Sequence, residues 1–182
     1  MNDTQGLLAL GVPSSVGSLN FVPSGFSGAG NLVVASYNSS TLHTLPYSEV
    51  DGIYVFGNVT NSVSITGGPE GITHVPQGSE LFPNPSMLVS AYSAGSIVAY
   101  ETDANGLPIP ATARPFVTGL SGAEGATVDP VTGDFLFSTF GGGNQVVLVT
   151  GFIPEPSTYA FLFGLLCVGL LGARRHLRLR QS

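Results

Sequence analysis

Short apolar runs that end in an aromatic residue recur along this chain and predict β-strands. The three clearest runs cover residues 32–37, 87–92 and 135–140. Each is followed by a turn of small residues and then by a second strand-like run, which begins at Leu42, Ile97 or Val146. Two strand-like runs joined by a short turn are typical of a β-hairpin. The pattern therefore predicts three hairpins.

A further strand-like segment precedes each predicted hairpin and ends at a proline. These segments are Gly71–Pro76, Gly125–Pro130 and, more weakly, Leu19–Pro23. Residues 129–134 predict a turn, because proline presets φ and glycine tolerates the positive φ that closes the turn. Asp51-Gly52 and Asn105-Gly106 mark further turns. The repeating unit is about 50 residues long with three or four short strands, which is the size of a propeller blade.

Glu70-Gly71 and Glu124-Gly125 each stand before a strand, a proline turn and an apolar strand that contains serine. This order resembles the NHL and gluconolactonase-like propeller families, over Ser18–Gly151. The resemblance implies an all-β fold of β-propeller-like repeats, while a β-sandwich or a solenoid would use the same strands and turns. We find about three blades, whereas closed propellers typically have four to eight. We therefore expect an incomplete propeller.

An uninterrupted apolar run near the C-terminus has no polar face at any helical period. From Tyr159 to Ala173 it would rise about 22 Å as a helix, so flanking residues would have to complete a span of the ~30 Å hydrocarbon core. The basic residues that follow it are Arg174, Arg175, Arg178 and Arg180. Basic residues on one side only are the positive-inside pattern. The sequence predicts a single transmembrane helix over 157–173 and a cytoplasmic tail over 174–182, with a buried core helix as the alternative.

Pro154, Glu155 and Pro156 stand shortly before this apolar run. The motif, the apolar helix and the arginine cluster, in this order, resemble the PEP-CTERM sorting signal of Gram-negative bacteria. The resemblance implies that a membrane-embedded exosortase recognises Pro154-Glu155-Pro156 and cleaves near it. The exported domain would then pass from the inner membrane to the cell surface or the exopolysaccharide matrix. Two prolines would keep the motif extended and accessible at the membrane face.

The two resemblances divide the chain into three parts: an N-terminal segment (1–17), a repeat domain (18–151) and a sorting signal (152–182). Proteins of this kind are expected to begin with an export signal. Residues 1–5 carry no basic group, and the apolar stretch Leu7–Leu10 is too short for the core of a signal peptide. We interpret the missing signal and the low blade number together as a truncated or mis-started gene model.

Charged residues make up only 9% of the chain, and the net charge is −6. Ten of the eleven acidic residues precede Pro154, but only one basic residue, Arg114, does so. A nucleic-acid-binding surface needs a cluster of basic side chains. The charge distribution therefore excludes nucleic acid as a partner of the repeat domain.

Residues with the spacing of a catalytic site are scarce. The three histidines, His43, His74 and His176, have no metal-ligand spacing. Ser27 lacks the second glycine of a nucleophile elbow, and residues 141–143 predict a glycine turn. We therefore expect a non-enzymatic, exported protein without a cofactor.

Two rival functions stay open. In lactonase-like propellers a glutamate before the first strand of a blade can ligate a divalent ion. The resemblance thus implies, as an alternative, an exported metal-dependent hydrolase that holds Ca²⁺ with Glu70 or Glu124. The other alternative is a glycan- or peptide-binding module that uses exposed Tyr37, Tyr92 and Phe140 at equivalent positions. Because these aromatic residues end apolar strands, we expect them in the core.

Overall fold

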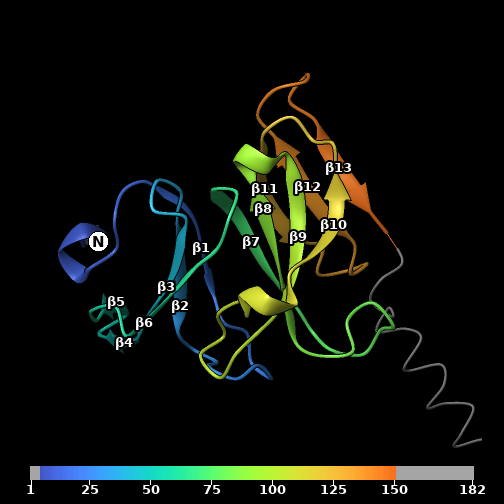
Figure 1. Cartoon of the computed structure of the whole chain (residues 1–182). Coiled ribbons are helices and arrows are strands. Elements are labelled where there is room, and N and C mark those ends of the chain that lie inside the picture. The colour runs from blue at the N-terminus through green and yellow to red at the C-terminus, as the bar shows by residue number, and fades with distance from the viewer. Residues whose placement is uncertain (1–4, 151–182) are drawn as a thin grey trace, which may run out of the picture.

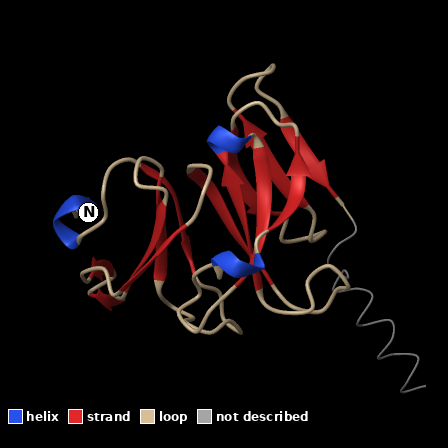
Figure 2. Ribbon diagram, viewed as in Figure 1, coloured by secondary structure: helices blue, strands red, loops and turns tan. Residues whose placement is uncertain are grey.

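A computed structural model describes residues 5–150 of the chain, and this part is built almost entirely from antiparallel β-strands (Figures 1 and 2). Its helical turns are three short 3-10 segments: η1 (Leu7–Leu10), η2 (Tyr92–Ala94) and η3 (Pro110–Thr112). The all-β fold class predicted from the sequence is therefore confirmed.

The first sheet runs in the order β1-β2-β3-β6. Its strands are β1 (Val16–Phe21), β2 (Leu32–Ser36), β3 (Thr41–Leu45) and β6 (Asn61–Ser64). A separate two-stranded hairpin, β4 (Tyr47–Val50) and β5 (Ile53–Phe56), interrupts the connection between β3 and β6. Asp51 and Gly52 form its turn, with φ values of 53° and 77° that suit a tight hairpin turn.

The second and third sheets repeat this order of neighbouring antiparallel strands. The second contains β7 (Pro69–Val75), β8 (Ser86–Ala91), β9 (Ser96–Glu101) and β10 (Arg114–Thr118). The third contains β11 (Ala123–Val128), β12 (Phe135–Thr139) and β13 (Val146–Val149). Within the described residues, none of these sheets closes into a barrel.

The predicted repeats correspond to these sheets. The three predicted hairpins are β2–β3, β8–β9 and β12–β13, and the strands predicted to precede them are β1, β7 and β11. The fourth strands, β6 and β10, follow long connections and were not identified as strands in the sequence. The repeat-like architecture is therefore confirmed, with one more strand in two of the three units.

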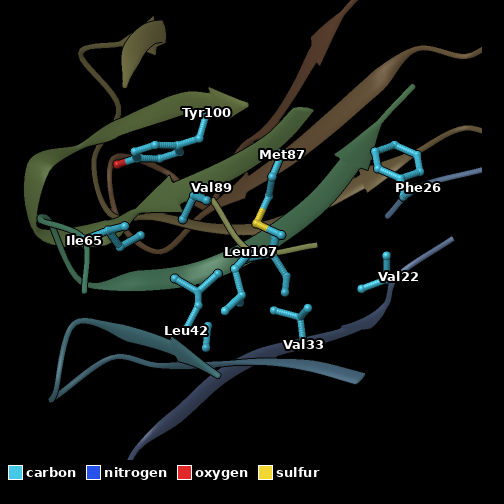
Figure 3. Packing of buried hydrophobic residues seen from close by; sticks show 11 residues of the cluster. Val22, Phe26, Val33, Leu42, Ile65, Met87, Val89, Tyr100 and Leu107 are labelled. Atoms are coloured by element: carbon cyan, nitrogen blue, oxygen red, sulfur yellow. The ribbon is translucent and has the colours of Figure 1, made fainter. Parts of the chain in front are cut away.

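Two hydrophobic clusters join the three sheets. The first lies between the first and second sheets, where Val33 and Leu42 face Met87 and Val89 (Figure 3). The second lies between the second and third sheets and includes Leu88, Ile97, Ala99, Phe135 and Phe137. The second sheet is thus covered on both faces, which explains why every residue of β8 is buried. Within the described residues β12 is covered on one face only, and its residues alternate in burial.

A third cluster covers the face of the first sheet that points away from the second. There Leu32, Val34 and Leu45 pack against η1 and the β4–β5 hairpin through Leu10 and Phe56. Figure 1 shows η1 and the hairpin on this side of the first sheet.

No helix within residues 5–150 has the length and hydropathy needed to cross a membrane. The predicted transmembrane helix over 157–173 and the basic tail over 174–182 lie outside the described residues.

Candidate functional site

The first strands of the three sheets lie side by side, with β7 in contact with both β1 and β11. Glycines make this approach close. A Cβ atom on Gly17 of β1 would lie 2.6 Å from the carbonyl oxygen of Pro69 and would overlap the Glu70 side chain. A Cβ atom on Gly71 of β7 would overlap the carbonyl oxygen of Glu124. Glycine is needed at both places because any side chain would push the strands apart.

Glu70 and Glu124 lie at this contact, each at an irregularity in strand pairing. The pairing of β7 with β8 shifts between Pro69 and Gly71, and the pairing of β11 with β12 shifts between Ala123 and Ala126. β1 has the same irregularity at Gly17. A bulge turns the side chain of the extra residue away from the regular alternation of the strand. The Glu-Gly pairs singled out in the sequence therefore occupy equivalent places on neighbouring sheets.

The two carboxylates influence each other. The pKa of Glu70 lies above its ordinary value, first because burial disfavours the charged form and second because the charge of Glu124 repels it. A carboxylate with a raised pKa is better able to carry a proton near neutral pH. This property suits an acid or base, but a catalytic centre also requires further groups around it.

The metal site implied by the lactonase-like resemblance is not assembled in the described residues. No three His, Cys, Asp or Glu side chains of these residues are grouped so that they could hold a metal ion. Ca²⁺ takes six to eight oxygen ligands, and the Glu70–Glu124 pair supplies two side chains at most.

Two other carboxylates considered in the sequence, Asp103 and Asp129, accept hydrogen bonds from the backbone amides of turns. Asp103 Oδ1 accepts hydrogen bonds from the amides of Asn105 (2.8 Å) and Leu107 (2.9 Å). Asp129 Oδ1 accepts from the amide of Val131 at 2.8 Å. The structure therefore confirms the interpretation of both segments as turns, and it uses these carboxylates for the backbone.

The aromatic residues that end the second strands behave differently from one another. The rings of Tyr37 and Tyr92 meet edge to face, with centroids 5.7 Å apart, and the Tyr37 hydroxyl lies 3.0 Å from Ser93 Oγ. Both tyrosines are partly buried between sheets. Phe140 is exposed. The expectation of a core position is thus wrong for Phe140, because no following sheet covers it within the described residues.

Both histidines in the described residues are buried and bonded. His74 Nε2 donates to the carbonyl oxygen of Gly106 at 3.2 Å, and its ring meets Phe26 edge to face. His43 Nδ1 lies 2.8 Å from Ser62 Oγ across the β3–β6 pair. Burial lowers the pKa of both. The His43–Ser62 pair has the contact of a nucleophile with its base, but His43 Nε2 has no hydrogen-bond partner to orient it in the described residues.

A groove of about 450 Å³ lies between β1 and the β4–β5 hairpin. Aromatic rings line it, including Phe21, Tyr54 and Phe56, and the side-chain amide of Gln5 bonds the backbone of Tyr54 and Phe56. The sequence reasoning identified the turn at residues 51 and 52 but missed the groove. The aromatic residues around that turn, Tyr47 before it and Tyr54 and Phe56 after it, were the available signal.

The sorting motif Pro154-Glu155-Pro156 and the arginine cluster at 174, 175, 178 and 180 lie outside the described residues. No protein-family model matches the chain, and no curated protein matches it.

Proposed function

We propose that this chain is an exported bacterial protein whose C-terminal signal is recognised and processed by an exosortase, and whose β-repeat body is non-catalytic. The observation that carries the proposal is the order of segments after β13. β13 ends at Val149, and Pro154-Glu155-Pro156 follows within a few residues. The apolar run from Tyr159 and then the arginine cluster complete the order.

This order gives each segment a physical role. The arginines resist transfer across the bilayer and stay on the anionic cytoplasmic side. The apolar run then spans the inner membrane, and the body lies outside. The proline-flanked Glu155 stands between body and membrane, where an exosortase can reach it. Cleavage there would transfer the body to the cell surface or the exopolysaccharide matrix.

We further propose that the body is an arc of propeller-like blades. Three features support this: each unit is an antiparallel sheet whose strands follow in chain order, apart from the β4–β5 hairpin inserted in the first; the first strands lie side by side; and each sheet packs face to face with the next. Three such sheets fall short of the four to eight that a closed propeller typically contains. We propose that this stacked-sheet body is a non-catalytic scaffold.

To test the proposal, the chain is expressed behind a cleavable export signal in a Gram-negative host that has an exosortase and in the same host without the exosortase. We expect a shortened, released body only with the exosortase, and an unprocessed, membrane-bound chain when residues 154–156 are replaced by alanine. Replacing the four arginines by serine should leave the protein unprocessed or mislocalised. Glu80→Gln, an exposed carboxylate of the body, is the matched control for Glu155→Gln and should be processed normally. Unchanged release of the 154–156 variant would contradict the proposal.

One observation favours a second candidate, a metal-dependent hydrolase: the interacting pair Glu70 and Glu124 at the convergence of the first strands. Turnover of lactones that is abolished by a chelator and by Glu124→Gln would support it. Binding of exopolysaccharide without turnover would instead favour a binding module.

A further inference from the structure

The outer face of the third sheet exposes apolar side chains at positions that the other two sheets bury. Val146 pairs with Ser138, just as Leu42 pairs with Ala35 and Ile97 with Ser90. Leu42 and Ile97 are fully buried against the next sheet, whereas Val146 is 70% exposed. Leu148, opposite Leu136, is 58% exposed. We call Leu136, Phe140, Val146 and Leu148 the open face.

Phe140 lies on the open face at a position where the equivalent residues of the other sheets pack against the next sheet. The amides of Tyr37, Tyr92 and Phe140 donate to equivalent carbonyl oxygens, those of Ser15, Gly68 and Gly122. The Tyr37 ring lies against Gly68 of the second sheet's repeat, and the Tyr92 ring lies against Gly122 of the third. Phe140, at the same place, is 63% exposed. A small residue from one more sheet would complete the series.

At the opposite end of the stack, the first sheet exposes residues equivalent to those that receive a neighbouring sheet inside the chain. Leu19 pairs with Val34 and Phe21 with Leu32, in the same way as Ile72 pairs with Val89 and His74 with Met87. Ile72 and His74 are buried against the first sheet, while Leu19 is 56% exposed. η1 and the β4–β5 hairpin cover β2 and β3, and Tyr47 and Tyr54 of the hairpin pack against Phe21. Val16 and Leu19 stay exposed. We call Ser15, Val16, Leu19 and Phe21 the receiving edge.

We propose that the open face of one copy of this chain docks on the receiving edge of a second copy, so that the stack of sheets continues from one molecule to the next. The contact occurs twice inside the chain, between the first and second sheets and between the second and third. Leu32 and Val34, the equivalents of Met87 and Val89, are already buried beneath η1 and the hairpin, so the receiving edge offers the first-strand part of the accepting positions. Ser15 is the small residue equivalent to Gly68 and Gly122. Docking would remove both exposed apolar surfaces from water.

This contact joins two different surfaces, so its geometry differs from that of a face-to-face dimer. A head-to-tail contact closes into a ring or continues as a chain of molecules. In either case the open face of a molecule meets the receiving edge of another and never a second open face. That asymmetry can be tested directly.

The first experiment measures the mass of the full chain in mild detergent over a range of concentrations. We expect self-association, and Val146→Asp should raise its dissociation constant by at least about tenfold, because the contact would bury an unpaired charge. Val131→Asp is the matched control: Val131 is 77% exposed but lies in the turn between β11 and β12. A monomer at every concentration, or equal effects of the two variants, would overturn the proposal.

The second experiment mixes two single-cysteine forms, both carrying Cys167→Ser. One has Phe140→Cys on the open face and the other has Ser15→Cys on the receiving edge. A short thiol cross-linker should join the two forms into a dimer and should not join either form to itself. Linking of the Phe140→Cys form to itself would show a face-to-face contact and refute the head-to-tail arrangement.

Discussion

Gly71 of β7 lies directly against Glu124 of β11, so that a Cβ atom at Gly71 would overlap the Glu124 carbonyl oxygen and lie 2.8 Å from the amide nitrogen of Ala126. One sheet earlier Gly17 makes a similarly close contact with β7, where a Cβ atom would overlap the Glu70 side chain and lie 2.6 Å from the carbonyl oxygen of Pro69. The spacing between neighbouring sheets at their first strands therefore depends on two glycines. Both belong to the contact that holds the proposed arc together.

Gly71→Ala should destabilise the fold by ~1–3 kcal/mol, because the added methyl group meets backbone atoms that cannot rotate away. Gly6→Ala is the control, since nothing lies within 4 Å of a Cβ atom at Gly6. Urea denaturation of both variants measures the difference. Equal stabilities for the two variants would mean that β7 and β11 are not in close contact.

Glu70→Gln should stabilise the protein at neutral pH by no more than about 1 kcal/mol. The pKa of Glu70 is raised above 4.5 in the fold, so the fold favours the protonated form. Its stabilising contribution is present below the unfolded pKa and is lost as the pH rises through the folded pKa. The advantage of the uncharged glutamine should therefore vanish in acid.

Thermal unfolding at neutral pH and below pH 4.5 checks the Glu70 prediction. Glu80→Gln, at an exposed position, should leave the stability unchanged at both values. A Glu70→Gln variant that is less stable than the wild type at neutral pH would indicate that the carboxylate makes a favourable contact.

His74 should make the fold sensitive to mild acid. Burial lowers the pKa of His74 below 6.5 and outweighs the opposing effect of its bond to Gly106. The unfolded chain then binds the proton more tightly, so stability is full above pH 6.5 and falls as the pH drops toward the folded pKa. Chemical denaturation between about pH 7 and about pH 5 should show this loss, and His74→Gln should reduce the slope. An unchanged slope would exclude His74 as its source.

Asp103→Ala should cost about 1–3 kcal/mol, because it leaves the amides of Asn105 and Leu107 without their acceptor. Asp103→Asn keeps one acceptor oxygen and should cost less. Leu107 lies in the cluster between the first and second sheets, so the turn positions a core residue. If both variants were as stable as the wild type, the carboxylate would have no structural role and could be reconsidered as a ligand.

Local patterns were sufficient to predict much of the fold. The hairpins β2–β3, β8–β9 and β12–β13 follow from apolar runs and turn residues that are adjacent in sequence. β6 was missed because it pairs with β3 across the inserted β4–β5 hairpin, and such a pairing leaves no mark in a short window of sequence. The aromatic groove was missed for the same reason, since Gln5, Phe21 and Tyr54 come from distant segments.

The amino-acid sequence alone determined the repeat, its turns and the order of motif, apolar run and arginines at the C-terminus. These features depend on residues that are neighbours along the chain. Only the tertiary structure decided which equivalent residues are buried. Leu42, Ile97 and Val146 are interchangeable in the sequence pattern, yet Val146 alone faces solvent. Burial depends on whether another sheet packs against the face, and that is a property of the stack rather than of any one repeat.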